Sequence, residues 1–287
     1  MSRPVGAPVA PDADAARVAA IRNSIDLRDK GSLESFGERA RREVGASLAR
    51  LHAEAGGREL GDLSDALRRA GDAVRALDPA MLTPTGMANL FGGRGRRLNW
   101  FRAKFDAAAR ALDGVTAELR DRTHRIEKKG HSLNTLHEQA RGFILELDAH
   151  LAAGRARGAE ALNQAGEKAA EAAECLHSRI GDLEGLRSTA IQQLPLVRMV
   201  QNVDAPVSEA VERAVGAIAA WKTDWSERLG MQLDPRLKLR PDEGGLEGAK
   251  TRLLEALAAT EASLAEARGR RGEAEAEMEQ AAKRAKA

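Results

Sequence analysis

The densest group of residues able to do chemistry lies between positions 187 and 225, inside a stretch rich in large aliphatic side chains. Amide and guanidinium groups among aliphatic residues are costly to bury unless each meets a hydrogen-bond partner. Tryptophan and arginine are also enriched where proteins contact one another. The stretch therefore predicts either an internal polar network that fixes the helices or a groove for a partner, and both interpretations stay open. The residues concerned are Gln192, Gln193, Pro195, Arg198, Gln201, Asn202, Trp221, Lys222 and Trp225.

A second candidate is the basic segment that follows Gly92 and Gly93. It contains no acidic residue before Asp106, and arginine side chains match the oxygens of phosphate groups. Trp100 stands beside these arginines and has the amphipathic character of an interfacial residue. The segment predicts either a solvated basic turn or a site for an anionic ligand or membrane lipid. Its basic residues are Arg94, Arg96, Arg97, Arg102 and Lys104.

Patterns typical of catalysis or metal binding are missing from the sequence. Cys175 is the single cysteine, so reduction by a dithiol pair within the chain lacks its second thiol. None of the six histidines lies four residues from another, which is the spacing of a helical metal-binding pair. We therefore expect a protein that is not an enzyme, with no catalytic residue, no metal and no cofactor.

Composition favours long helices. The chain has 287 residues, of which 43% are hydrophobic, 31% charged and only 3% aromatic. A formal net charge of +2 argues against a dedicated nucleic-acid-binding protein. The N-terminus lacks the apolar core of a signal peptide, and no apolar run is long enough to span a bilayer. With its single cysteine, these features predict a cytoplasmic protein.

Apolar periodicity predicts an all-α fold, an elongated antiparallel helical bundle with a long coiled-coil-like hairpin arm. A heptad repeat begins at Leu98 and crosses Gly130 without a slip, so one helix of more than about fifty residues is expected. Arg122 and Lys129 interrupt the repeat, and at this polar centre we expect the helix to bend or to face water. The expected parts are a disordered tail (1–12), N-terminal helices of a base (13–97), the arm (98–190), a kinked helix and a tryptophan helix completing the base (191–230), a linker (231–245) and a C-terminal helix (246–287).

Local signals set other helix boundaries. Ser32 can cap a helix that continues to Gly56. Pro195 predicts a kink or restart, because proline lacks the N–H that a helix interior requires. The sequence Asp-Ala-Pro at 204–206 then predicts the start of a new helix, whose tryptophans would face the preceding one.

Several short motifs are shared with one family. They are Gln192, Pro195, Val197-Arg198, Val200-Gln201-Asn202 and Trp221-Lys222, with LGDL at 60–63, LDP at 77–79, GMANLFG at 86–92, LDAHLAAG at 147–154, and Arg271, Ala274-Glu275 and Glu277 near the C-terminus. Together they resemble the toxic anion resistance family typified by TelA and KlaA, the tellurite-resistance proteins. His150 stands where the family pattern has tyrosine, and a TN-x-L-x-x-NA motif of the family has no match here.

The resemblance implies a non-enzymatic cytosolic accessory or scaffold protein of toxic-anion and envelope-stress resistance. Such a protein would bind other proteins of the resistance system, at a membrane surface or as a homo-oligomer. Two alternatives remain: a module that binds an anionic ligand or membrane lipid through Arg94–Lys104, and, third, a tellurite-reducing enzyme.

Overall fold

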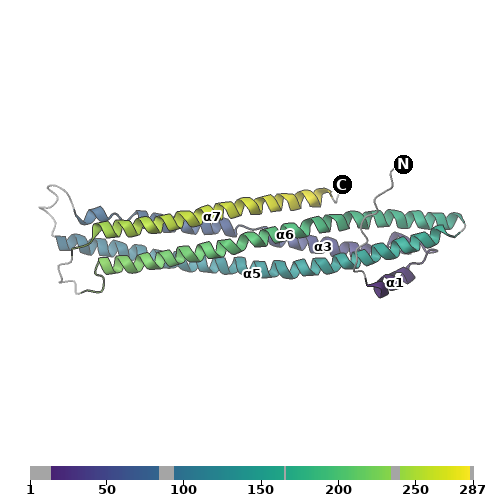
Figure 1. The fold of residues 1–287 in the computed structure, drawn as a ribbon, viewed down its shortest axis with the longest axis horizontal. Helices are drawn as coiled ribbons and strands as arrows, with labels where there is room; N and C mark the ends of the chain where they lie inside the picture. The colour runs from purple at the N-terminus through teal and green to yellow at the C-terminus, as the bar shows by residue number, and fades with distance from the viewer. Residues whose placement is uncertain (1–13, 84–93, 165, 234–239, 285–287) are drawn as a thin grey trace. The chain divides into compact units, whose positions relative to one another are not determined.

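The computed structural model describes residues 14–83, 94–164, 166–233 and 240–284, and every regular element in this part of the chain is a helix (Figure 1). The elements are α1 (Ala15–Ser24), α2 (Lys30–Glu34), α3 (Glu38–Ala55), α4 (Glu59–Arg75), the 3₁₀ helix η1 (Pro79–Leu82), α5 (Arg94–Leu162), α6 (Glu167–Arg228) and α7 (Glu243–Arg284). The predicted all-α fold is confirmed. The tail at 1–12 and the GMANLFG motif lie outside the described residues. No helix in the described part is both long enough and apolar enough to cross a membrane.

The chain forms two compact units. Unit 1 consists of Met1–Gly56, His131–Val200 and Glu273–Ala287, and unit 2 of Gly57–Gly130 and Gln201–Gly272. Helices α5, α6 and α7 each contribute to both units. These boundaries differ from those of the predicted base and arm, and that division of the chain stays a prediction.

Unit 2 is an up-and-down four-helix bundle made of α4 and parts of α5, α6 and α7. Along each pair of successive helices, residue numbers rise on one helix as they fall on the other, so the neighbours are antiparallel. The defining pairs are Glu59 with Lys129 and Arg69 with Glu118 for α4 and α5, Gln201 with Gly130 and Lys222 with Asp113 for α5 and α6, and Trp225 with Leu246 and Thr260 with Ala210 for α6 and α7. The heptad residues Leu112, Leu119 and Ile126 are fully buried in its core.

Unit 1 is built on the hairpin of α5 and α6. The ion pairs Arg155–Glu184 and Asp148–Arg187 show that the two helices are antiparallel here as well. Helices α1 and α3 and the end of α7 pack on this hairpin through one apolar cluster. Each leucine that the cluster buries completely contributes about 1.5–3 kcal/mol relative to an exposed one. The predicted single long helix is confirmed, since α5 spans 69 residues.

The helix predicted from Ser32 to Gly56 is broken, and that expectation was wrong. Gly37 adopts a left-handed conformation with φ of 71°, which ends the first segment and allows α3 to begin at Glu38. A Cβ atom at this position would lie 2.5 Å from Cδ1 of Leu183. Glycine is therefore required both by the backbone conformation and by the close approach of α6.

The new helix predicted at 204–206 does not occur, because α6 continues from Glu167 to Arg228. Pro195 and Pro206 both lie on its exposed side, where the carbonyl groups they leave unpaired can bond to water. On the buried side, Val200, Val203 and Val207 continue the apolar stripe past both prolines. Packing along this stripe outweighs the loss of two backbone hydrogen bonds.

Replacing Gly37 with alanine is expected to lower the free energy of unfolding by about 1–3 kcal/mol, because the new methyl group meets Leu183 and the left-handed conformation is strained. Urea titration followed by circular dichroism measures the change. Gly45→Ala in α3 is the matched control: nothing lies within 4 Å of its Cβ position, so it should stabilise by up to about 1 kcal/mol. Equal stability of the two variants would contradict the packing argument.

Candidate functional site

The polar residues predicted on α6 divide between faces of one helix. Gln193, Arg198 and Gln201 turn toward the core or toward α5, whereas Gln192 and Asn202 are exposed. Trp221 and Trp225 lie on this same helix, so the predicted groove between two facing helices does not exist in that form. The structure thus separates the predicted group into a set packed inside the bundles and a set on an outer face.

Arg198 forms a polar layer with α5 in unit 1. Its Nη1 donates to Oδ1 of Asn134 at 2.5 Å, and its Nη2 lies 3.3 Å from both Nδ1 of His137 and Oε1 of Glu138. Since a guanidinium group only donates, Nδ1 of His137 accepts in this contact when it carries no proton. The same Nδ1 is 3.3 Å from Oε1 of Glu138, to which it donates only when it is protonated. Burial lowers the pKa of His137, the hydrogen bond to Glu138 opposes this, and the nearby Arg198 charge adds to the lowering. The layer therefore favours a neutral imidazole.

A second polar layer lies inside unit 2, where α4, α5, α6 and α7 each contribute one charged side chain. Nζ of Lys129 lies 3.2 Å from Oε1 of Glu59, and Nη2 of Arg271 lies 3.6 Å from Oδ2 of Asp204. Nη1 of Arg271 is also 3.8 Å from Oε2 of Glu59, which links the two pairs. We call Glu59, Lys129, Asp204 and Arg271 the charged quartet. Its two acids and two bases balance, as buried charges require.

The pKa values of the two carboxyl groups in the quartet are shifted in opposite directions. Side-chain exposure is only 7% for Asp204 and 4% for Arg271, and neither Asp204 oxygen accepts a hydrogen bond from the described residues. Burial raises the pKa of Asp204 against the opposing charges of Arg271 and Lys129. Burial also acts to raise the pKa of Glu59, but its own backbone N–H, Lys129 and Arg271 outweigh this and leave that pKa lowered. Asp204 is thus the carboxyl group of the pair that takes up a proton more readily.

One interpretation of the heptad break was that Lys129 and Arg122 face water. Instead, both side chains pair with acidic residues of α4. Lys129 reaches Glu59, and Nη1 of Arg122 donates to Asp62 of α4 at 2.5 Å. Both long side chains bury their stems beside α4 and pair their charged ends with its acids.

The tryptophans form an aromatic cluster in the core of unit 2. Trp221 and Trp225 have ring centroids 4.8 Å apart, and Phe105 lies 5.5 Å from Trp221 and 5.7 Å from Trp225. Nε1 of Trp225 donates to the carbonyl of Leu246 at 3.0 Å, which ties α6 to α7. Lys222, between the two tryptophans, pairs with Asp113 of α5. Trp221, Trp225 and Lys222 therefore connect α6 to its neighbours inside unit 2.

The outer face of α6 carries an apolar stripe that sequence reasoning only partly identified. Ile191 and Met199 are 41% and 39% exposed, and Pro195 lies exposed between them. Their spacing of four residues places them in one line along the helix. Gln192, which donates to Oγ of Ser188 at 3.4 Å, borders the stripe. This is the part of the predicted group that is accessible to a partner.

The basic segment at the start of α5 is partly used inside unit 2. Nε and Nη2 of Arg102 donate to the carbonyls of Leu229 and Gly230 at 2.7 and 3.0 Å, which caps the end of α6. Nζ of Lys104 lies 4.1 Å from the ring centroid of Trp100, a cation–π contact on the surface. Arg96 is exposed, Arg97 is half-buried, and the side chain of Arg94 lies outside the described residues.

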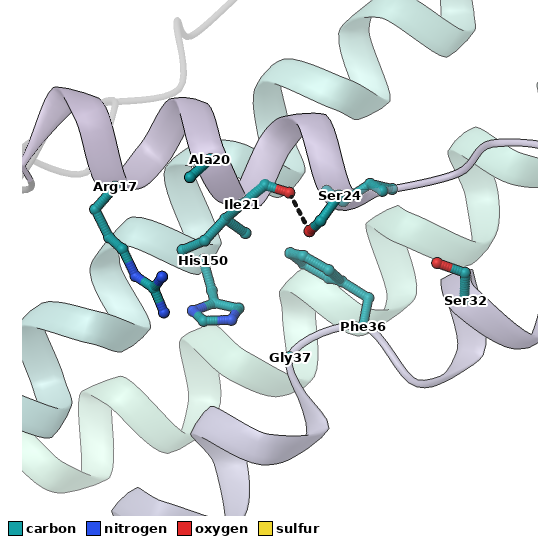
Figure 2. A pocket seen from close by; sticks show the side chains of 9 residues that line it. Arg17, Ala20, Ile21, Ser24, Ser32, Phe36, Gly37 and His150 are labelled. Atoms are coloured by element: carbon teal, nitrogen blue, oxygen red, sulfur yellow. Dashed lines mark hydrogen bonds between the residues drawn. The ribbon is translucent and has the colours of Figure 1, made fainter.

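A cavity of about 330 Å³ opens in unit 1 between α1, Phe36 and α5 (Figure 2). Nδ1 of His150 donates to the carbonyl of Glu146 at 2.9 Å, and the ring lies 5.9 Å from that of Phe36. Arg17 at the rim is held by two hydrogen bonds from Nε to the Glu146 carboxylate, at 3.1 and 3.0 Å. With the arginine charge matched in this way, the cavity offers a lining that is more polar than apolar, to which the imidazole edge of His150 contributes. His150 thus lines a cavity.

Groups suited to metal or redox chemistry are sparse among the described residues. No three or more histidine, cysteine, aspartate or glutamate side chains in that part of the chain form a group that could hold a metal ion. Cys175 is a half-buried free thiol. The expectation that the protein works without a metal, cofactor or catalytic residue stays a prediction.

Asp204, Arg271 and Lys129 were missed as a site, although the sequence held a signal for them. Each takes a position where the apolar stripe of its own helix calls for a hydrophobic residue, with Asp204 between Val200 and Val207. A charge in such a stripe indicates a partner on a neighbouring helix. The sequence does not say which helix supplies it.

Comparison with known proteins identifies relatives of this chain. The family described as toxic anion resistance protein (TelA) matches residues 18–233. Similar proteins include TelA-like proteins of Staphylococcus haemolyticus strain JCSC1435 (22% identity over 234 residues, 74% of this chain and 60% of the relative), Staphylococcus saprophyticus strain ATCC 15305 (21% over 236 residues, 74% and 63%) and Staphylococcus aureus strain Mu50 (20% over 229 residues, 72% and 61%). The chain spans about three fifths of the length of these relatives. No solved structure matches it.

Arg271→Met is expected to destabilise the protein by about 3–5 kcal/mol, because it leaves the buried Asp204 carboxylate without its ion-pair partner. Chemical denaturation measures the loss. Arg270→Met is the matched control, since Arg270 is exposed and pairs with Glu266 on the surface, which is worth at most about 1 kcal/mol. A similar loss in both variants would mean that the quartet is not a coupled buried group.

The lowered pKa of His137 predicts that the stability of the fold depends on pH. Its pKa is lowered in the folded state, so the unfolded chain binds the proton more readily, and the free energy of unfolding should fall as pH drops below the ordinary histidine value of 6.5. His137→Gln should reduce this slope in thermal unfolding measured between about pH 7.5 and pH 5.5. His131→Gln, an exposed histidine of the same helix, should leave the slope unchanged. An unaltered slope in His137→Gln would contradict the assignment.

Proposed function

Because the chain belongs to the toxic anion resistance (TelA) family, we propose that it serves resistance to toxic anions, tellurite among them, as a non-enzymatic scaffold. In this role it binds other proteins of a stress-response system and carries out no reaction on the anion. The partners would be cytoplasmic proteins or the cytoplasmic parts of membrane proteins.

The observation that supports this proposal is the exposed apolar stripe of Ile191, Pro195 and Met199 on α6. Exposed apolar side chains are common singly, but three in line on one helix face are suited to contact with another protein. Proline has a fixed backbone φ angle and loses no side-chain entropy on binding, so ordering it in an interface costs little conformational entropy. The buried valines Val197 and Val200 on the opposite side hold the helix in place while its outer face stays accessible.

The chemistry of the chain supports a scaffold over a reductase. Reduction of an oxyanion by protein thiols consumes pairs of electrons, and each pair is supplied by forming a disulfide between two thiols. Cys175 has no second cysteine in this chain to pair with. The charged quartet lies in the core, with side-chain exposure of 7% for Asp204 and 4% for Arg271, so a substrate oxyanion has little access to it.

The test is affinity capture from cells exposed to tellurite, followed by reconstitution with the purified partner. Replacing both Ile191 and Met199 with aspartate should weaken binding of the partner by about tenfold or more, since two apolar contacts become charged. Both side chains are already exposed, so the fold should be unchanged by circular dichroism. Leu162→Asp is the matched control: this residue is exposed at the far end of α5, and the variant should bind as the wild type does. A partner held equally by the double variant would overturn the assignment of the stripe.

A further inference from the structure

A basic and apolar surface gathers at one end of unit 2. The start of α5, the end of α6 and the start of α7 lie together there, as Figure 1 shows and as the bonds from Arg102 to Leu229 and Gly230 require. Among the described residues of this unit, three large apolar side chains are exposed: Met81 in η1, Trp100 in α5 and Leu233 just after α6. All three belong to segments at this end. We call Met81, Arg96, Trp100, Lys104 and Leu233 the end patch.

Trp100 differs from the other tryptophans of the chain. It is 48% exposed, whereas Trp221 and Trp225 are 3% and 0% exposed in the core. Lys104 covers one part of its ring at 4.1 Å and leaves the indole accessible. Tryptophan beside lysine, with one amphipathic ring and one charge, is the combination favoured at the boundary between lipid headgroups and acyl chains.

The charge of the end patch is positive. From Arg94 to Lys104 the sequence contains five basic residues and no acid. Some of the acids nearby are paired within the unit: Asp106 with Arg110, and Asp224 and Asp242 with the single Arg228. Glu227 and Asp78 are exposed at this end and Glu243 is half-buried, and Oδ1 of Asp78 accepts from the backbone N–H of Ala80.

The charge at the start of α5 also departs from that of its neighbours. α3, α4, α6 and α7 each begin with glutamate, which suits the positive end of a helix dipole, whereas the first turn of α5 has no acidic residue. Its arginines add to the dipole, so the local potential favours an anionic surface.

We propose that the end patch docks unit 2 on an anionic lipid bilayer, with Trp100, Met81 and Leu233 entering the interface and Arg96 and Lys104 contacting the headgroups. Exposed apolar side chains beside the exposed positive charges of Arg96 and Lys104 match a membrane surface, where anionic headgroups cover an apolar layer. Single-stranded nucleic acid lacks the apolar layer that Met81 and Leu233 would enter. Docking of this kind is independent of the apolar stripe on α6, which lies in unit 1.

The experiment is co-sedimentation of the full chain with vesicles. Binding is expected to an equimolar mixture of phosphatidylglycerol and phosphatidylcholine and not to phosphatidylcholine alone, and it should weaken as salt rises. Arg96→Ala with Lys104→Ala should lower the partition coefficient by roughly fivefold for each basic side chain removed. Arg268→Ala, an exposed arginine of α7, is the charge control and should bind as the wild type does.

Tryptophan fluorescence tests insertion directly. Since Trp221 and Trp225 are buried, collisional quenching by brominated lipid should report on Trp100. Anionic vesicles that contain brominated phosphatidylcholine should quench the wild type and leave Trp100→Ser unquenched. Equal binding to neutral vesicles, binding unaltered in the Arg96 and Lys104 double variant, or preference for single-stranded DNA over vesicles would each overturn the proposal.

Discussion

The structure depends on the apolar seam between α5 and α6. In each unit these helices run antiparallel and bury a regular series of side chains, among them Leu112, Leu119, Leu133 and Leu147. The other helices pack on this pair: α4 and α7 in unit 2, and α1 and α3 in unit 1. Because α6 has its buried face fixed by the seam, two prolines on its exposed side do not end it.

Charged side chains in this seam meet partners on neighbouring helices. Arg198 contacts Asn134 and His137, and the members of the charged quartet, one from each of four helices, form ion pairs with one another. Replacement of buried ion pairs by hydrophobic residues is often neutral or stabilising, so we expect these groups to contribute more to selecting one register and one set of neighbours than to stability. Gly57 fits the same constraint, since a Cβ there would lie 2.6 Å from Nζ of Lys129.

The motif residues shared with the family have different physical roles in this chain. Arg198, Gln201, Trp221 and Lys222 connect helices inside the units. Pro195 and its exposed apolar neighbours lie on the surface of α6. A motif can therefore combine residues that pack a helix against its neighbours with residues exposed on its surface. Only the exposed residues are available for binding a partner.

The sequence by itself determined the all-α class and the long helix α5, because apolar periodicity is a local property: the heptads from Leu98 predicted α5, and composition predicted the class. It also identified Arg198 and Lys222 as candidates for a polar network or a partner-binding groove. Only the tertiary structure decided that Lys129 pairs with Glu59, that Asp204 lies in a buried quartet and that α6 runs through Pro195 and Pro206. The reason is that charge pairing and tolerance of proline depend on which helices become neighbours, and a periodic pattern identifies the face a helix buries without naming what covers it.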